Sequence, residues 1–369
     1  MFHEKVRKLA HTIVNYSLSI KKGEKFLIEV RGEGTDSILR AIIEETLKVG
    51  GIPYWNRNDD AINASFVKNA DEEQIKAWGQ MQKMVMESID AYVSIRGSDN
   101  AFEMSSIPKA NMKNYMKWFH EEVHSKIRVP KKKWVVLRWP NNSMAQLAEM
   151  STEDFAKFYF ETCTLDYAKL SVEMEKLKKL MERTDKVRLV AKGTDISFSI
   201  KDIPVLKCDG KLNIPDGEVY TAPVKNSING VIQYNAPSFY NGKLFADVRL
   251  EVKEGKIVKA SCAGDNEALN AVFDTDEGAR FFGEFAVGVN PFISTPMKDT
   301  LFDEKIYGSI HFTPGASYDD AFNGNKSAVH WDLVLIQTPE YGGGEIWFDD
   351  VLIRKDGEFM ISELKGLNR

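Results

Sequence analysis

Short apolar runs separated by amphipathic segments fill the first half of the chain and constrain its fold more than any other feature. Residues 26–30, 92–95 and 134–137 have the length and composition of buried strands. Helical periodicity fills the stretches between them, as in the segment that begins near Asp36 and ends at Gly50. Strands separated by helices require crossover connections. The first half is therefore predicted to be an α/β domain with a largely parallel sheet.

The second half of the chain has a different pattern. Val248, Leu250 and Val252 alternate with polar residues, as expected of antiparallel strands with one buried face. Asp356-Gly357 lies between two apolar runs and is typical of a tight hairpin turn. These signals predict an α+β domain dominated by antiparallel sheet.

A helical stretch marks the boundary between the two patterns. Residues 152–183 contain neither proline nor glycine, and their last part is rich in Lys and Glu. Such a helix often bridges two domains, and a length of 369 residues suits two domains. We therefore expect an α/β domain over residues 1–185, ending in this bridging helix, and an α+β domain over residues 186–369.

The composition excludes several classes of partner. The formal net charge is -5, and Lys and Arg are scattered among acids, which argues against a nucleic-acid partner. No apolar run approaches the roughly 18 residues of a membrane helix, and the charged N-terminus does not read as a signal peptide. Cys163, Cys208 and Cys262 are too widely spaced for a disulfide framework or a cysteine-based metal site. We expect a cytoplasmic protein without a membrane partner.

A zinc-protease motif in the first half lacks the context that its chemistry needs. Residues 120–124 read His-Glu-Glu-Val-His, and on a helix the two imidazoles would share one face. Glu122, however, places a charge where zinc proteases have an uncharged residue, and no third ligand follows before the strand at 134–137. The exposed charged face of a helix that covers the sheet is the better interpretation.

A glycine pair after the first predicted strand also falls short of a cofactor site. Gly32-Glu33-Gly34 lacks the third glycine of a dinucleotide-binding loop, because Ser37 stands in its place. Tight turns explain these glycines, and no cofactor-binding residues are assigned.

The strongest site signal is a histidine and a carboxylate two residues apart. The chain has only six histidines, and His330 lies with Asp332 in an apolar run, residues 328–334, that reads as a buried strand. Alternate residues of a strand project from one face, so the two side chains point the same way and Trp331 points to the other face. Such a pair could bind a metal. The alternative interpretation is a buried His–Asp hydrogen bond without a metal.

Further candidate ligands lie nearby in the sequence. His311 is in another strand-like run, and Tyr318 follows a Pro-Gly turn. Glu218 and Glu284 are single carboxylates in apolar segments marked by glycine, and burying such charges is costly without a compensating cation. A mixed oxygen and nitrogen set suits Zn²⁺, Co²⁺ or Mn²⁺. Because these groups exceed what one catalytic zinc takes from protein, two divalent ions that share a carboxylate fit better.

Four segments of the second half match a known family in order and type: Glu-Val-Tyr-Thr-Ala-Pro, Gly-Glu-Phe-Ala-Val-Gly-Val-Asn, Asp-Glu-Lys-Ile-Tyr-Gly-Ser-Ile-His and Ser-Ala-Val-His-Trp-Asp. Over essentially its whole length the chain resembles the aminopeptidase T and aminopeptidase S family of metal-dependent aminopeptidases. The resemblance implies a homodimer that removes N-terminal residues from peptides with two divalent ions. It implies the following metal-site residues in the α+β domain: Glu218, Glu284, His311, Tyr318, His330 and Asp332.

The resulting hypothesis is hydrolysis by a metal-activated water. Glu284 is the first candidate for the base that accepts the proton of the water, and Glu218 is the second, although both are also candidate ligands. Tyr318 would donate a hydrogen bond to the developing oxyanion or bind a metal directly. Glu304 is an additional candidate for a ligand or a base.

Two alternatives remain open at this point. His311, His330 and Asp332 alone form a two-histidine, one-carboxylate set, as in Fe(II) oxygenases, and ring-cleaving dihydroxypyridine dioxygenases resemble this peptidase family. The presence of both Glu218 and Glu284 favours the peptidase. The second alternative is a non-catalytic, metal-stabilised protein that binds peptides.

Overall fold

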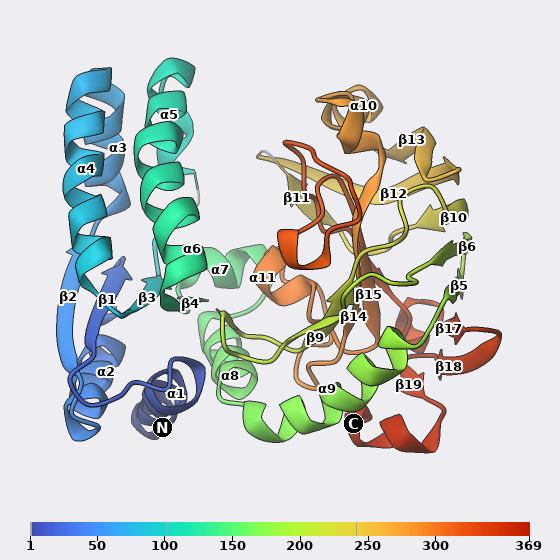
Figure 1. The fold of residues 1–369 in the computed structure, drawn as a ribbon, viewed down its shortest axis with the longest axis horizontal. Coiled ribbons are helices and arrows are strands. Elements are labelled where there is room, and N and C mark those ends of the chain that lie inside the picture. The colour runs from blue at the N-terminus through green and yellow to red at the C-terminus, as the bar shows by residue number, and fades with distance from the viewer. Residues whose placement is uncertain (1, 101, 241) are drawn as a thin grey trace. The chain divides into compact units, whose positions relative to one another are not determined.

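The chain forms two compact units in a computed structural model that describes residues 2–100, 102–240 and 242–369 (Figure 1). The N-terminal unit comprises Met1–Leu165 and Gly210–Ile214, and the C-terminal unit comprises Asp166–Asp209 and Pro215–Arg369. The boundary predicted near residue 185 therefore falls inside the C-terminal unit.

The helical stretch predicted over residues 152–183 consists of two helices, α8 (Thr152–Cys163) and α9 (Tyr167–Glu182). Asp166 separates them, because its side chain accepts a hydrogen bond from the backbone N–H of Lys169 and caps α9. The second helix packs within the C-terminal unit, where the Tyr167 hydroxyl accepts a hydrogen bond from the Asp216 backbone at 3.1 Å. A helix-capping aspartate thus marks the boundary between the two units.

The N-terminal unit contains a five-stranded parallel sheet with the order β2-β1-β3-β4-β8. The strands are β1 (Lys25–Arg31), β2 (Ile52–Asn58), β3 (Ala91–Arg96), β4 (Lys133–Arg138) and β8 (Asn213–Ile214). Ahead of α8, the helices are α1 (Phe2–His11), η1 (Thr12–Ser17), α2 (Asp36–Lys48), α3 (Asp60–Asn69), α4 (Glu72–Ser88), η2 (Glu103–Ser106), α5 (Lys109–Tyr115), η3 (Met116–Arg128), α6 (Val129–Lys131) and α7 (Asn142–Leu147). The predicted α/β class and parallel sheet are confirmed.

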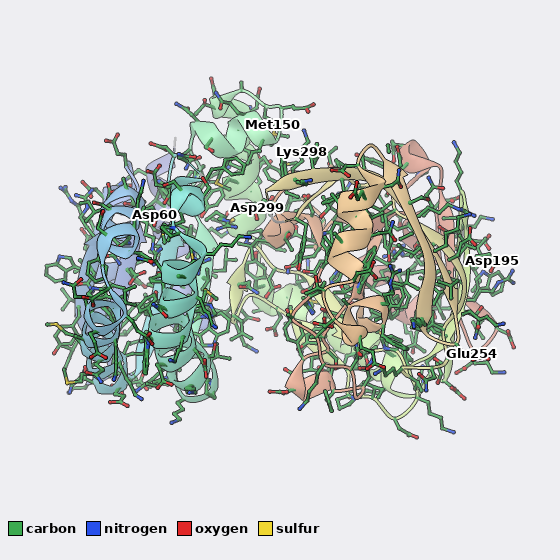
Figure 2. The ribbon with its side chains drawn as sticks, turned by 90° about the horizontal axis from the view of Figure 1, so that it is seen from above. Asp60, Met150, Asp195, Glu254, Lys298 and Asp299 are labelled. Carbon is green, nitrogen blue, oxygen red and sulfur yellow. The ribbon has the colours of Figure 1, made fainter. Side chains whose placement is uncertain are left out.

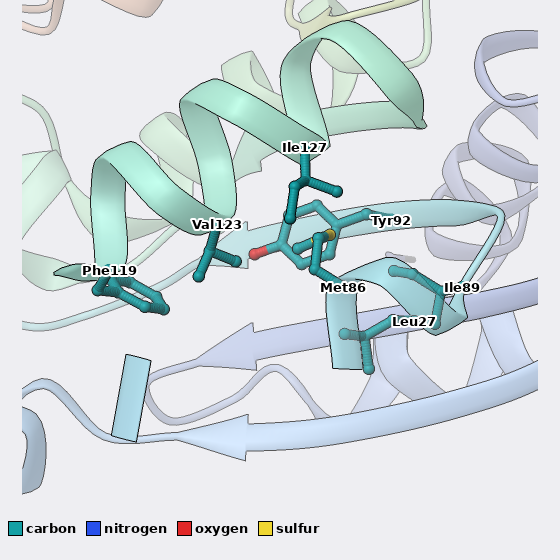
Figure 3. Close-up of a cluster of buried hydrophobic side chains, with 7 residues drawn as sticks. All are labelled: Leu27, Met86, Ile89, Tyr92, Phe119, Val123 and Ile127. Carbon is teal, nitrogen blue, oxygen red and sulfur yellow. The ribbon is translucent and has the colours of Figure 1, made fainter. Parts of the chain in front are cut away.

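Helices α4 and η3 bury the apolar side chains of one sheet face, as Figure 3 shows. The cluster draws on two strands and two helices and comprises Leu27, Met86, Ile89, Tyr92, Phe119, Val123 and Ile127. The three helical positions 119, 123 and 127 are four residues apart, so they form one stripe on η3. This stripe sets which face of η3 meets the sheet.

The C-terminal unit contains two antiparallel sheets, which confirms the predicted α+β class. The larger has the order β11-β12-β10-β6-β5-β17-β18-β19, with β13 paired to β12. Its strands are β5 (Lys186–Ala191), β6 (Thr194–Ser199), β10 (Asn229–Gln233), β11 (Ser238–Tyr240), β12 (Lys243–Lys253), β13 (Lys256–Ala263), β17 (Gly344–Phe348), β18 (Val351–Lys355) and β19 (Glu358–Phe359). The predicted turn at Asp356-Gly357 joins β18 to β19, and both turn residues have positive φ, 49° and 87°.

The smaller sheet carries three of the candidate site residues, Glu218, Glu284 and His311. Its order is β16-β15-β14-β9-β7, and the strands are β7 (Leu206–Cys208), β9 (Glu218–Thr221), β14 (Phe282–Gly288), β15 (Ser309–Pro314) and β16 (Val334–Ile336). Every residue of β14 and β15 is buried. Besides α9, the helical segments are α10 (Asn266–Phe273), η4 (Glu277–Arg280), α11 (Thr300–Asp303), η5 (Asp319–Ala321), η6 (Pro339–Tyr341) and η7 (Ser362–Leu367).

Aromatic rings fill the space between the two sheets of this unit. Phe312 of β15 stacks on Phe282 of β14 and on Phe198 of β6, with ring centroids 4.3 Å and 4.6 Å apart. The large sheet also has a solvated region, where Arg188 pairs with Asp195 at 2.8 Å and Asp195 projects outward (Figure 2). The smaller sheet therefore offers a desolvated surface for polar chemistry, and this region of the larger sheet does not. None of the described helices has the length and apolar character needed to cross a membrane.

Candidate metal centre

Strand register brings three of the predicted residues onto one face of the smaller sheet. Glu218 of β9 pairs with Gly288 of β14, and His311 of β15 pairs with Ala286 of β14. Glu284, Ala286 and Gly288 alternate along β14, so they share one face. Residues far apart in the sequence therefore converge because of pairing, not because of a local motif.

His330 and Asp332 approach the same centre from the segment that precedes β16. This segment was predicted to be a strand, but only an isolated bridge between His330 and Gly315 forms there. The segment is still extended, since Trp331 N–H bonds to the Pro314 carbonyl at 3.1 Å. The Trp331 ring packs away from the centre against Tyr240 and Phe245. The strand prediction is wrong in its hydrogen bonding, whereas the predicted pairing of the two side chains is present.

The distances within the centre are short. Glu284 is the common neighbour of both imidazoles, with Oε1 3.3 Å from His311 Nε2 and Oε2 3.2 Å from His330 Nε2. His330 Nε2 also lies 3.3 Å from Asp332 Oδ1, and His311 Nδ1 lies 3.5 Å from Glu218 Oε2. Ligand atoms of Glu284, His311 and Asp332 all fall within 4.8 Å of one another. Such a spacing can accommodate a cation between them.

The hydrogen bonds of His330 support a cation at this position. Its Nδ1 lies 2.7 Å from the Ala316 carbonyl oxygen, and a carbonyl can only accept, so Nδ1 donates. In the neutral imidazole, Nε2 then carries a lone pair instead of a proton. This nitrogen is buried, has no hydrogen-bond partner and faces the carboxylates of Glu284 and Asp332. Acceptors that face one another need a proton or a metal between them. A backbone carbonyl that orients the ring is the usual support of a metal-binding histidine.

The pKa shifts in the centre also indicate that a positive charge is favoured there. Burial disfavours the charged imidazole, but Glu218 and Glu284 outweigh it and raise the pKa of His311 to about 10. The pKa of His330 is also raised well above its usual value, because Asp332 and Glu284 overcome desolvation. The pKa of Asp332 is lowered in spite of burial, chiefly by His330. Divalent metals compete with protons for such groups.

Thr313 is a supporting residue that sequence reasoning missed. Its hydroxyl donates a hydrogen bond to Asp332 Oδ1 at 2.8 Å. Thr313 pairs with Glu284 in the β14–β15 register, so it shares the face of the centre. A threonine two residues after His311 on the same strand was the available signal.

Lys305 is the second missed residue and the more consequential one. Its side chain is fully buried and its Nζ lies 3.0 Å from Glu218 Oε1 and in contact with Glu304. Burial lowers the pKa of Lys305, but Glu218 and Glu304 reverse this effect and raise it well above the usual value. Glu304 itself joins a second group of possible ligands with Glu218 and His311. Burial raises the pKa of Glu304 well above its usual value, despite the nearby Lys305.

Tyr318 lies at the open side of the centre. Its ring is 4.6 Å from the ring of His330 and 5.8 Å from that of Tyr220, measured between centroids. Although 48% of the residue is exposed, loss of solvent around the hydroxyl and the charge of Glu284 raise its pKa well above the usual value. The hydroxyl therefore stays protonated at neutral pH and can donate a hydrogen bond.

The zinc-protease motif belongs to η3 of the N-terminal unit, whereas the candidate metal centre belongs to the C-terminal unit. Glu122 is paired with Lys83 at 3.0 Å and also contacts Lys126, and Glu121 is paired with Lys126 at 3.0 Å. The rings of His120 and His124 are 5.8 Å apart, and Arg128 is among the charges that lower the pKa of both. Positive charge beside both imidazoles opposes a cation there.

Comparisons with known proteins agree with the geometry. The family of thermophilic metalloproteases (M29) matches residues 2–359. Aminopeptidase T of Thermus thermophilus is 34% identical over 137 residues, which cover 33% of this chain and 34% of that protein. Aminopeptidase PepS of Streptococcus thermophilus is 24% identical over 402 residues, covering 90% of this chain and 92% of that protein. The matched stretch thus spans about a third of aminopeptidase T.

Two solved structures share the fold over nearly the whole chain. AmpT from Thermus thermophilus has a TM-score of 0.77 at 21% identity and covers 98% of this chain and 100% of that chain. The 2,5-dihydroxypyridine dioxygenase from Pseudomonas putida has a TM-score of 0.61 at 12% identity, covering 98% and 99%. Because the family match extends over almost the whole sequence, the chain belongs to the M29 family of thermophilic metalloproteases.

Proposed function

We propose that the protein is a metal-dependent aminopeptidase that hydrolyses the first peptide bond of substrates with a free N-terminus. The observation that carries the proposal is the buried, unpartnered Nε2 of His330, which faces two carboxylates. Membership of the M29 family and the aminopeptidase names of the relatives supply the reaction class. The site residues all belong to the C-terminal unit.

The ligand set would fit two divalent ions, and Zn²⁺, Co²⁺ and Mn²⁺ suit its oxygen and nitrogen donors. The residues that would hold them are Glu284, His311 and Asp332, whose ligand atoms fall within 4.8 Å of one another, together with Glu218 and His330. When bound, such ions polarise a carbonyl and acidify a water. Glu284 lies next to both imidazoles, so it would be within reach of either ion.

The residues of the chain have separate tasks in this scheme. Glu284 accepts the proton of the attacking water, with Glu218 as the second candidate for this role, and the proton then passes to the leaving amine. Tyr318 donates a hydrogen bond to the oxyanion of the tetrahedral intermediate. Its position beside His330 and its half-exposed ring place it where a substrate can enter. The burial of Glu284 and His311 keeps water away from the proton-transfer groups.

Hydrolysis of aminoacyl-p-nitroanilides tests the proposal. The chain is stripped with a chelator and reconstituted with Zn²⁺, Co²⁺ or Mn²⁺. Metal-dependent release from free amino substrates, with N-acetylated substrates left intact, is the expected result. No release with any metal would contradict the proposal. Oxygen uptake with Fe(II) and a dihydroxylated pyridine would instead support a dioxygenase, and tight binding of uncleaved peptides would support a non-catalytic role.

Assembly and location belong to the same proposal. The family resemblance supports a homodimer, and the widely spaced cysteines support a reducing cytoplasmic location. Analytical ultracentrifugation of the full chain tests the first point. A single species of twice the 41.8 kDa chain mass is expected. A monomer at micromolar concentration would contradict it.

A further inference from the structure

Lys305 is a permanent positive charge inside the candidate metal centre. The backbone holds it there: its N–H bonds to the Phe302 carbonyl at 3.0 Å at the end of α11, and its carbonyl accepts from Asn290 N–H at 3.1 Å. The backbone at Lys305 and Ile306 also packs closely against Gly288 of β14. The side chain is fully buried, so the ammonium cannot reach water without a rearrangement of these contacts.

The ammonium of Lys305 contacts only one of the two carboxylate oxygens of Glu218. Glu218 Oε1 is 3.0 Å from Lys305 Nζ, whereas Oε2 has no hydrogen-bond partner and faces His311 Nδ1 at 3.5 Å. Glu304 contacts the same ammonium through its own carboxylate. The lysine therefore holds one oxygen of Glu218 and one of Glu304 and leaves the other Glu218 oxygen for the metal side.

The structure contains two groups of possible ligands around His311, and Lys305 distinguishes them. One group is Glu218, Glu304 and His311, and the other is Glu284, His311 and Asp332. The ammonium already bridges the two glutamates of the first group. In that group His311 presents Nδ1, which lies 3.3 Å from the Glu304 carbonyl oxygen, while Nε2 faces Glu284. A divalent ion in the first group would be repelled by the ammonium.

We propose that Lys305 acts as a built-in cation that closes the Glu218–Glu304 side to metal and confines the divalent ions to the side centred on Glu284. The inference rests on the proposed metal-dependent function. It assigns Glu304 to the ion pair with Lys305 instead of to the ligands or the base. Glu218 then binds metal through one oxygen, because the lysine holds the other.

Counting the metal ions bound by matched variants tests this assignment. The variants are Lys305→Met, which keeps the length of the side chain but removes its charge, Glu304→Gln, and the double variant. Lys243→Met is the control, since it removes a lysine from an exposed ion pair with Asp265. Each purified full-length chain is saturated with Zn²⁺, desalted and measured by elemental mass spectrometry, with circular dichroism to select folded protein.

Lys305→Met is expected to bind one more Zn²⁺ per folded chain than the wild type, because the freed carboxylates accept a cation. The double variant is expected to return to the wild-type number, and the Lys243→Met and Glu304→Gln variants to keep it. Lys305→Met with an unchanged or smaller number of ions would overturn the proposal. If Lys305→Met folds only in buffer that contains Zn²⁺, its bound ions are counted in protein folded in that buffer. A double variant that folds without added metal then supports the assignment.

The count separates this proposal from the aminopeptidase proposal. If the wild type binds metal but cleaves no aminoacyl substrate, the aminopeptidase proposal is contradicted. The ion counts of the variants then still decide the role of Lys305. A wild type that cleaves substrates, with a Lys305→Met variant that gains no ion, contradicts only the role of Lys305.

Discussion

Two histidine pairs, one in each unit of the chain, show how surroundings decide what the same side chains can do. His120 and His124 stand one helical turn apart in a zinc-protease motif, while His311 and His330 are separated in sequence and belong to no local motif. Burial and the positive charge of Arg128 lower the pKa of His124 to about 3. Around His311, carboxylates overcome burial and raise the pKa to about 10. Burial and positive charge therefore disfavour a protonated imidazole in the motif, whereas carboxylates favour one among the scattered residues.

The largest effect is expected for the shared carboxylate. Glu284→Gln removes both the proton acceptor and a charge between two imidazoles, so hydrolysis should fall by about 10³-fold or more. Steady-state hydrolysis of a p-nitroanilide with saturating Zn²⁺ measures it. The matched variant in the other region is Glu122→Gln, in the zinc-protease motif, which should retain wild-type turnover. A large loss in Glu122→Gln would break the comparison between the two regions.

Removal of the Tyr318 hydroxyl is expected to have the next largest effect. Tyr318→Phe should lower kcat by about 10²-fold, because one donor to the oxyanion is lost. Metal content should stay at the wild-type level. If the variant instead loses a metal ion, Tyr318 is a ligand, and the division of roles within the centre has to be redrawn.

Loss of the Thr313 hydrogen bond should weaken metal binding without abolishing it. Thr313→Val leaves Asp332 unsupported, and the affinity for Zn²⁺ should fall by roughly 10-fold, as for other residues that orient ligands. Competition with a chromogenic chelator measures the affinity. Thr275→Val is the control, because that hydroxyl donates only to the Ala271 carbonyl near the end of α10. Equal affinities in the two variants would contradict the role of Thr313.

Metal binding near pH 8 should release protons. A raised pKa of about 10 against the ordinary 6.5 means that His311 is protonated at pH 8 in the metal-free chain, and the metal requires its neutral form. The same shift stabilises the metal-free fold fully below pH 6.5, and this contribution is lost as the pH rises through about 10. Calorimetry of Zn²⁺ binding in buffers of different ionisation enthalpy counts the protons. No release at pH 8 would contradict the assigned ionisation.

The sequence was sufficient for the buried strands of the first half, and it failed where burial and pairing carry the information. β2 was missed because it is a largely exposed edge strand without an apolar run. The helix break at Asp166 was missed because an aspartate within a helical pattern signals a cap only weakly. His330 and Asp332 were paired correctly from their spacing, although the hydrogen bonding of their segment is irregular.

Lys305 shows the same limit within the site. In sequence it stands beside Glu304 as an ordinary surface pair would, and nothing local indicates that it is fully buried. Its position follows from the close approach of its backbone to β14. Such a tertiary contact cannot be predicted from composition or periodicity.

X-ray diffraction at the zinc absorption edge, from crystals of the Zn²⁺-loaded chain, tests the central claim most directly. The account predicts anomalous density among Glu284, His330 and Asp332 in the C-terminal unit, and none beside His120 and His124. Zinc at the helical motif, or no zinc at the Glu284 centre in a chain that hydrolyses aminoacyl substrates, would contradict it.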